Sequence, residues 1–302
     1  MIENRGVIDT IFNFMNVKGV GPVQTNKLLL SLRDLNTKVA LFDQAKTLLN
    51  QTQREEFELS KDLNVEITTK FPVSFLSVQD PKYPVALKHC LKNATPPVLS
   101  LIGNVELLNK KMVAFSGSRN VSDKGIKIAE DVSAALVEQD VCIVSGYAKG
   151  VDFTAHYTAL NSGGTTIIVL PEGINHFRIK KELKDIWDWD RVLVISEFQP
   201  HEKWMTSRAM KRNLTIIGLS DVVLVVEAGA KGGSLDAGEK TLQLGKYLFV
   251  PQYGNVPESA AGNPTLLNRG AFPLKMNKET MKPNLSKINE VLNQARKYSL
   301  FV

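Results

Sequence analysis

Between residues 111 and about 270, the hydrophobic positions form short, nearly continuous apolar runs separated by longer amphipathic stretches. The runs are rich in β-branched residues and have the length of strands, whereas the stretches between them have the helical period. Strands of this kind between helices are typical of a parallel sheet that helices cover on both faces. The pattern predicts an α/β fold, a Rossmann-like doubly wound, mainly parallel sheet over residues 111–272. The expected strands are MVAFS, VCIVS, TTIIVL, RVLVIS, DVVLVVEA and YLFVP.

Helical patterns connect these strands. One runs from Ser122 to about Glu138, and the next runs from about Gly150 to Asn161. The later ones contain RIKKELKDI, a basic segment that ends in TIIGL, and SLDAGEKTLQLG.

The flanking parts have different patterns. Residues 1–75 predict a helical N-terminal module, in which VKGVGPVQTNKLL joins two amphipathic segments. This hairpin is either a DNA-contacting helix-hairpin-helix, whose amides meet a phosphate, or a plain turn between helices with glycine caps. Residues 76–110 are punctuated by prolines and predict a linker with a first short strand, VLSLIG. Residues 273–302 predict a short, basic C-terminal helix that begins at about residue 278.

The composition adds few constraints. The chain has 302 residues, of which 43% are hydrophobic and 23% charged, and its net charge of +6 permits a polyanionic partner. Its cysteines, Cys90 and Cys142, cannot build a disulfide framework or a cysteine-rich metal site. No signal peptide is recognised, and no apolar run reaches the roughly 20 residues of a membrane span. We therefore expect a cytoplasmic protein that does not contact a membrane.

Small and cationic residues gather where the expected strands end. Ligands of open parallel sheets bind beyond the carboxyl ends of the strands, where helix N-termini point. Glycines let the backbone approach a ligand, and helix N-termini add oriented N–H groups. Neither G-x-G-x-x-G after the first strand nor a P-loop motif is present, which excludes a conventional NAD or P-loop site. We expect a phosphate site made of Ser116, Gly117, Ser118, Arg119, Ser145, Gly146, Lys149, Gly150, Lys231, Gly232, Gly233 and Ser234.

An ordered series of motifs points to a known family. Between about residues 75 and 272 the chain contains GSR, SGYAKGVDFTAH, ISEF, RAMKRNLTIIGLSD, VVEAGAKGGSLDAGEKTLQLG, VPQYGN and GNPTLLNRGA, in this order. The series resembles the DNA processing protein A family, also called Smf. The helical N-terminal module and the proline-rich segment are similar to that family as well.

The resemblance implies a protein that binds single-stranded DNA and loads the RecA recombinase onto it, in natural transformation or related recombination. It also implies a homodimer and no established catalysis, so we expect no enzyme, no cofactor and no metal. By the same resemblance, Ser145, Gly146 and Lys149 hold a phosphate. The residues expected to face the DNA backbone are Arg119, Arg208, Lys211 and Arg212, with Asn213 beside them.

The chain departs from the family's pattern in four places. Leu214 stands where the motif RNRII has its second arginine, which removes one phosphate or base contact. The motif SGSL-x-TA is altered from Gly233 onward, and VPG reads VPQ. A single helix stands where the family usually has a C-terminal winged helix. We therefore expect changed DNA affinity and none of the partner functions of that domain.

Four residues near the strand ends are interpreted as loop-orienting. Asp152 and His156 follow SGYAKG on one helix, and Glu197 and Glu227 each end a strand. A histidine without a nucleophile makes a poor active site, so we expect His156 to be packed and bonded to Asp152. We expect Asp152 to cap its helix or orient the loop, and the glutamates to position loop amides or pair with arginines. The alternative for the glutamates is metal binding or acid–base work.

Aromatic residues offer candidate surfaces for base stacking. Trp204 and Phe177 fall in loops on the strand-end side and are the better candidates. Trp187 and Trp189 are flanked by aspartates, which predicts surface packing or an interaction patch instead. A basic segment nearby is either a solvated face or a DNA-facing stripe, and it contains Arg178, Lys180, Lys181 and Lys184.

Two other functions remain open from the sequence. One is an enzyme or sensor for a small nucleotide, because phosphoribohydrolases on the same Rossmann variant have a PGG-x-GT-x-x-E signature. Gly232, Gly233 and Glu239 resemble part of that signature. The other is an interaction scaffold with a vestigial pocket.

Overall fold

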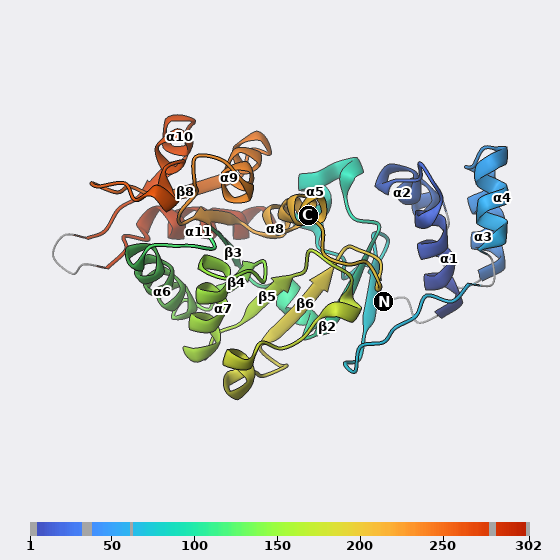
Figure 1. Ribbon diagram of the computed structural model, residues 1–302, viewed down its shortest axis with the longest axis horizontal. Coiled ribbons are helices and arrows are strands. Elements are labelled where there is room, and N and C mark those ends of the chain that lie inside the picture. Colours follow the sequence, from blue (N-terminus) through green and yellow to red (C-terminus); the bar gives the residue numbers. More distant parts are fainter. Residues whose placement is uncertain (1–4, 32–37, 61–62, 278–281, 300–302) are drawn as a thin grey trace.

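The computed structural model describes residues 5–31, 38–60, 63–277 and 282–299, in which helices surround one large sheet (Figure 1). This described part contains a nine-stranded sheet in the order β1-β2-β6-β5-β4-β3-β7-β8-β9. All neighbours from β6 to β9 pair in parallel, whereas β1 and β2 form an antiparallel edge. The strands are β1 (Ser74–Ser77), β2 (Val98–Gly103), β3 (Met112–Ser116), β4 (Cys142–Ser145), β5 (Thr166–Val169), β6 (Val192–Ser196), β7 (Val222–Val225), β8 (Tyr247–Pro251) and β9 (Phe272–Leu274).

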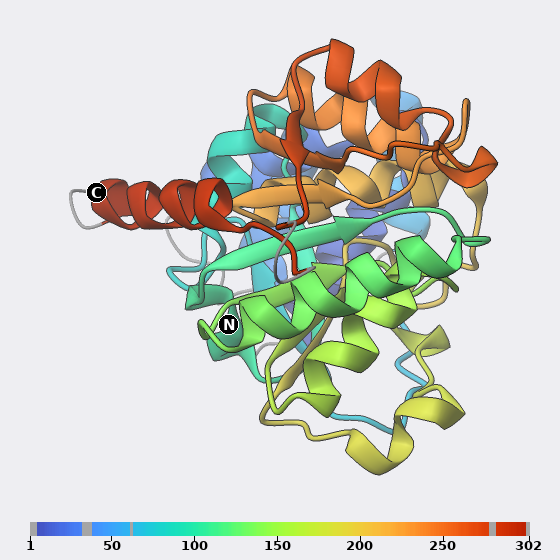
Figure 2. The same cartoon turned by 90° about the vertical axis from the view of Figure 1, so that its left-hand side faces the viewer.

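One face of the sheet is covered by α6 (Asp123–Val137), α7 (Val151–Asn161) and α11 (Ser286–Ser299). Ile128 of α6, Ala155 of α7 and Ile288 of α11 pack there with Phe115 and Leu224 of the central strands. Ser122 caps α6 by accepting a hydrogen bond from the amide of Gly125. Figure 2 shows α6, in green, in front of the strands.

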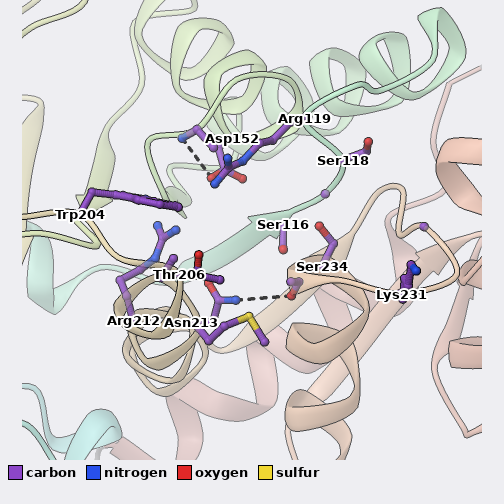
Figure 3. Close-up of a pocket in the computed structure, with 16 residues that line it drawn as sticks. Ser116, Ser118, Arg119, Asp152, Trp204, Thr206, Arg212, Asn213, Lys231 and Ser234 are labelled. Carbon is purple, nitrogen blue, oxygen red and sulfur yellow. Dashed lines mark hydrogen bonds between the residues drawn. The ribbon is translucent and has the colours of Figure 1, made fainter.

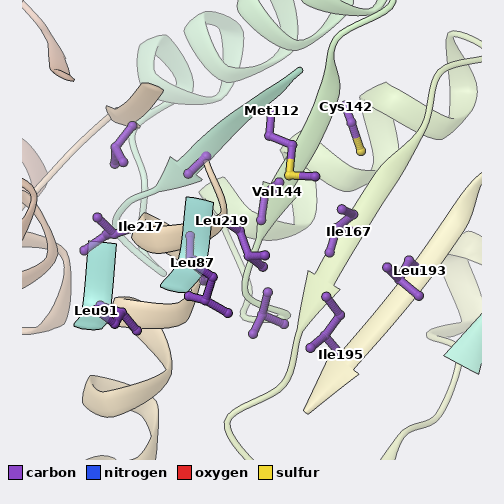
Figure 4. Close-up of a cluster of buried hydrophobic side chains, with 14 of the residues drawn as sticks. Leu87, Leu91, Met112, Cys142, Val144, Ile167, Leu193, Ile195, Ile217 and Leu219 are labelled. Atoms are coloured by element: carbon purple, nitrogen blue, oxygen red, sulfur yellow. The ribbon is translucent and has the colours of Figure 1, made fainter. Parts of the chain in front are cut away.

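The opposite face is covered by α5 (Val85–Leu91), α8 (Thr206–Leu219), α9 (Gly233–Gln243) and α10 (Asn263–Asn268). Leu87 of α5 and Ile217 of α8 pack there against Val144 and Ile167 of the sheet (Figure 4). Alternate residues of the central strands thus point into two separate cores, which is why those strands are apolar along their whole length. The expected Rossmann-like fold is confirmed.

The N-terminal module consists of α1 (Arg5–Asn16), α2 (Pro22–Ser31), α3 (Lys38–Thr47) and α4 (Gln51–Leu59). Its core contains Phe12, Phe14 and Phe57, and Phe75 of β1 joins it. In the hairpin before α2, the amide of Lys18 donates to Glu56 and its carbonyl accepts from Gln53, both on α4. Part of the hairpin backbone is therefore used for packing within the module.

The segment 76–110, expected to be a linker with one short strand, contains that strand as β2, which pairs with β6 in the main sheet. The segment also provides α5, so it is part of the folded domain and not a separate linker. The prolines mark the beginnings of elements, since Pro84 is the N-cap of α5 and Pro97 directly precedes β2. The boundary expected at residue 75 falls inside β1.

Two expected helices differ in the structure. RIKKELKDI forms only a 3-10 helix, Lys181–Ile186, because the chain there follows the surface of a small core around Phe177 and Leu183. The C-terminal helix begins at Ser286, and its expected beginning near residue 278 lies outside the described residues. Within the described residues, no helix combines the length and apolar character that crossing a membrane requires.

Candidate nucleic-acid interface

The strand order creates a topological switch point between β3 and β7. These strands are paired neighbours, but the chain leaves β3 toward α6 on one face and leaves β7 toward α9 on the other. Ligands of doubly wound sheets bind in the crevice at such a point. A cavity of about 430 Å³ lies there, and we call it the switch-point cavity (Figure 3).

Three parts of the chain make most of the wall of the switch-point cavity, and Ala148, Asp152 and Trp204 complete it. The loop after β3 contributes Ser116, Gly117, Ser118 and Arg119. The loop after β7 contributes Lys231, with Gly233 and Ser234 at the beginning of α9. The N-terminal half of α8 contributes Thr206, Met210, Arg212 and Asn213. Ten of the predicted site residues thus meet at one cavity when Asp152, at its floor, is included.

Hydrogen bonds between backbones tie three strand-end loops together. The amide of Ser118 donates to the carbonyl of Glu227 at 2.8 Å, and the amide of Val151 donates to the carbonyl of Ser118 at 3.3 Å. Gly150 permits this approach, because a Cβ there would lie 2.3 Å from the carbonyl oxygen of Ser118. Its φ of 72° also lies in the left-handed region that favours glycine. The loop after β3 is therefore fixed from both sides.

Glu227, for which the sequence predicted contacts with loop amides or arginines, lies just after β7. Its carboxylate is fully buried and accepts hydrogen bonds from the amide and hydroxyl of Ser122, the N-cap of α6. The hydroxyl of Tyr253, in the segment after β8, donates to the same carboxylate at 3.0 Å. Glu197 is also buried, and it pairs with Lys211 at 3.2 Å and accepts from the hydroxyl of Thr215.

His156 does not bond to Asp152 as the sequence suggested. Its Nε2 donates to the carbonyl of Gly146 at 2.7 Å, and its Nδ1 lies 2.6 Å from the hydroxyl of Thr166. The ring points into the sheet, although Asp152 lies one helical turn away on α7. Burial, with smaller effects from the charges of Lys180 and Arg212, lowers the pKa of His156 to about 4. A neutral ring that donates from Nε2 has a lone pair at Nδ1, and the Thr166 hydroxyl that it faces also lies 2.8 Å from the carbonyl of Ile143, to which it donates.

The carboxylate of Asp152 orients the loop after β4, accepting a hydrogen bond from the amide of Ala148 at 3.3 Å. Burial raises the pKa of Asp152, and the positive charge of Arg212 opposes that rise. Lys180, expected on either a solvated face or a DNA-facing stripe, donates to the carbonyls of Tyr147 and Ala148 in the same loop. No sequence signal distinguished it from the neighbouring lysines.

Several predicted phosphate ligands lie beside or below the switch-point cavity and do not line it. Ser145 is fully buried and donates to the carbonyl of Phe115, and Gly146 lines a space of about 20 Å³ below the cavity. Lys149 is exposed on the loop, and Ala148 lines the cavity in its place. The loop after β4 curls over α7 and presents its carbonyls to His156 and Lys180. The predicted residues outside the cavity lining are Ser145, Gly146, Lys149, Gly150, Arg208, Lys211 and Gly232.

The basic residues of α8 lie partly at the cavity and partly at the surface of the protein. Arg212 is only 7% exposed and donates from Nη1 to the carbonyl of Val169 at 2.8 Å. Burial lowers its pKa, which the charges of Asp152 and Glu197 oppose. Arg208 instead pairs with Glu202 and donates to the carbonyl of Lys203.

The two candidates for base stacking, Trp204 and Phe177, also differ in position. Trp204 lines the switch-point cavity, is 47% exposed, and lies under the guanidinium of Arg119, which is 5.9 Å from the ring centroid. Phe177 is 1% exposed and packs against Trp187 and Trp189, so the prediction that it stacks a base is wrong. The turn Ile174–His176 directs the Phe177 ring into a core instead of toward solvent.

Two alternative chemistries find no support at the switch-point cavity. Glu239, the glutamate of the hydrolase-like signature, pairs with Arg269 of the α10 region and does not line the cavity. Among the residues that the structure describes, no three histidine, cysteine, aspartate or glutamate side chains are arranged to hold a metal ion.

The buried histidine predicts a pH dependence of stability. Because the pKa of His156 falls from 6.5 to about 4 on folding, the unfolded chain binds more protons between these values. The His156 contribution is present above pH 6.5 and is lost as the pH falls toward 4, by about 1.4 kcal/mol per pH unit at most. Denaturant unfolding of wild type and His156→Gln across this range measures it. Parallel pH profiles of the two proteins would contradict it.

The contact between Gly150 and Ser118 predicts a difference between two glycine substitutions. Gly150 and Gly163 both have positive φ, but a Cβ would meet neighbouring atoms within 4 Å only at Gly150. Gly163→Ala should cost about 1 kcal/mol of unfolding free energy for its backbone conformation. Gly150→Ala should cost roughly 2 kcal/mol more, because the loops must separate. Thermal and denaturant unfolding of both variants checks this, and equal losses would refute the tie between the loops.

Comparisons with known proteins agree with this geometry. The curated DNA processing protein DprA of Streptococcus pneumoniae is 38% identical over 200 residues, which cover 66% of this chain and 67% of that protein. An X-ray structure of the Streptococcus pneumoniae protein matches with a TM-score of 0.75 at 30% identity, covering 91% of this chain and 95% of that chain. A structure concerned with the single-stranded DNA binding mode of DNA processing protein A from Helicobacter pylori matches with a TM-score of 0.60 at 26% identity, covering 76% of this chain and 97% of that chain. The model of the DNA recombination-mediator protein A family matches residues 74–284, and this chain belongs to that family.

Proposed function

We propose that this chain binds single-stranded DNA at the switch-point cavity and presents it to the RecA recombinase, in natural transformation or another recombination process. The observation that carries the proposal is the cationic cavity itself, which combines the N-terminus of α9, cations and an exposed tryptophan at the switch point. The Helicobacter pylori relative, whose structure concerns its single-stranded DNA binding mode, supports it. By the same family resemblance, we propose that the protein acts as a homodimer.

The cations of the cavity suit a phosphate backbone. Arg119 and Lys231 are exposed, and within the described residues neither forms an ion pair. Exposed, unpaired cations can neutralise phosphates, while the buried guanidinium of Arg212 adds positive potential at the floor. Trp204 supplies the kind of surface on which any base can stack.

Leu214, which stands where the family's motif has its second arginine, does not deprive the cavity of a cation. Leu214 is partly buried and packs against the core beneath α8 and α5. It is absent from the cavity lining, whereas its neighbours Arg212 and Asn213 are present. The departure from the family's motif therefore leaves the proposed DNA contacts in place.

Salt dependence tests the binding proposal. The logarithm of the affinity for single-stranded oligonucleotides should fall linearly with the logarithm of salt concentration, by about 0.7 per neutralised phosphate. Arg119→Ala should weaken binding to all sequences and reduce the slope by about 0.7. Lys82→Ala, which removes an exposed lysine paired with Glu106 away from the cavity, is the control. A wild-type protein whose binding shows no salt slope would sink the proposal.

RecA presentation is tested separately. The protein should accelerate the assembly of RecA filaments on single-stranded DNA, measured by fluorescence or light scattering, and Arg119→Ala should reduce the acceleration because DNA is held less tightly. Equal RecA assembly with and without the wild-type protein would limit the function to DNA binding.

A further inference from the structure

A second cavity of about 650 Å³ lies between α6 and the segments that follow β8 and β9. We call it the α6–β8 cavity. Its apolar wall includes Ile128 of α6, Tyr253 after β8, and Leu274 and Met276 at the β9 end. Lys124, Lys127 and Lys275 surround this wall. No sequence pattern indicated this cavity, because its residues come from three separate segments.

Positively charged side chains outnumber negatively charged ones around the α6–β8 cavity. Its lining has one acidic residue, Asp131, whose carboxylate is bound to the ammonium of Lys127 at 2.6 Å. Lys124 lies 5.2 Å from the centroid of the Tyr253 ring, and Lys275 is exposed. Two lysines therefore remain to neutralise an anion at the rim of an apolar hollow. A cationic rim around an apolar and aromatic wall suits single-stranded nucleic acid, whose phosphates and bases require these two kinds of surface together.

The two cavities lie on either side of one short segment. Arg119 lines the switch-point cavity and Lys124, five residues later, lines the α6–β8 cavity, so their Cα atoms are at most about 18 Å apart. Glu227 contacts the walls of both cavities, because its backbone carbonyl accepts from the amide of Ser118 at the switch-point cavity and its carboxylate accepts from the hydroxyl of Tyr253 at the α6–β8 cavity. The distance between the cavities is therefore set by buried contacts.

We propose that the α6–β8 cavity is a second subsite for single-stranded DNA, which takes flanking nucleotides of the strand that occupies the switch-point cavity. The proposal rests on the proposed function. Lys124 and Lys275 contact phosphates of the flanking nucleotides, and a base lies against the wall of Tyr253 and Met276. The strand passes the N-terminus of α6 between the two subsites.

Oligonucleotide length separates the two subsites experimentally. Binding is measured for oligonucleotides from about 4 to about 16 nucleotides, the range of single-strand site sizes. The double variant Lys124→Ala/Lys275→Ala should bind the shortest oligonucleotides as wild type does. For long oligonucleotides its salt slope should be smaller than that of wild type by about 1.4, two phosphates at about 0.7 each. A long oligonucleotide with abasic sites in its flanking nucleotides should bind more weakly than an intact oligonucleotide of the same length.

Two control variants make the outcomes distinguishable. Arg119→Ala should weaken short and long oligonucleotides alike, and Lys82→Ala should change neither. The second subsite is overturned if the double variant leaves the binding of long oligonucleotides unchanged, or weakens both lengths equally, while Arg119→Ala still weakens both. Loss of the salt slope in the wild-type protein overturns the proposed function instead. Circular dichroism of the double variant checks that its fold is intact, which is expected because both side chains are exposed.

Discussion

The buried carboxylate of Glu227 is the contact on which the geometry at the switch point depends. It lies at the end of β7, and its hydrogen bonds hold the beginning of α6 and the segment after β8. The backbone carbonyl of the same residue holds Ser118 in the loop after β3. A carboxylate without solvent must have its hydrogen-bonding capacity satisfied, and here it is satisfied by Ser122, the N-cap of α6, and by Tyr253, in the wall of the α6–β8 cavity. One fully buried residue thus fixes three segments that the chain brings together from distant positions.

A second set of buried charges forms the floor of the switch-point cavity. Arg212 and Asp152 approach each other beside Gly146, where a Cβ would lie 2.0 Å from Nη1 of Arg212 and 2.4 Å from Oδ2 of Asp152. Burial disfavours each charge alone, and each supports the charged form of the other. Gly146 of SGYAKG is therefore required because a larger residue would collide with both side chains. This requirement holds whether or not the loop contacts a ligand.

The N-terminal module supports the same edge of the sheet. The side-chain amide of Gln199, after β6, donates to the carbonyl of Phe12 at 3.0 Å and to Asn16 at 2.7 Å. Asn175, after β5, accepts from the amide of Thr68 and donates to the carbonyl of Glu66. Both residues are buried in loops at the carboxyl ends of strands. The module thus restrains the segment that leads from β6 to Trp204 and α8.

The sequence by itself determined the sheet, most of its helices and the loops that could carry a ligand. These follow from local patterns, since an apolar run such as VVLVV is a strand wherever it is buried on both faces, and Ser122 caps a helix by contacts within one turn. Only the tertiary structure decided which loop residues meet. Ser145 and Lys149 stand in the same loop as Ala148, yet the curl of that loop turns only Ala148 to the cavity. His156 bonds to Gly146 and Thr166 because its side chain points into the sheet, and helical spacing alone does not fix that direction. Pro97 resembled part of a linker because β6, which pairs with the strand directly after this proline, lies about a hundred residues away in sequence. Side-chain direction and long-range pairing are set by packing, and a local pattern does not contain them.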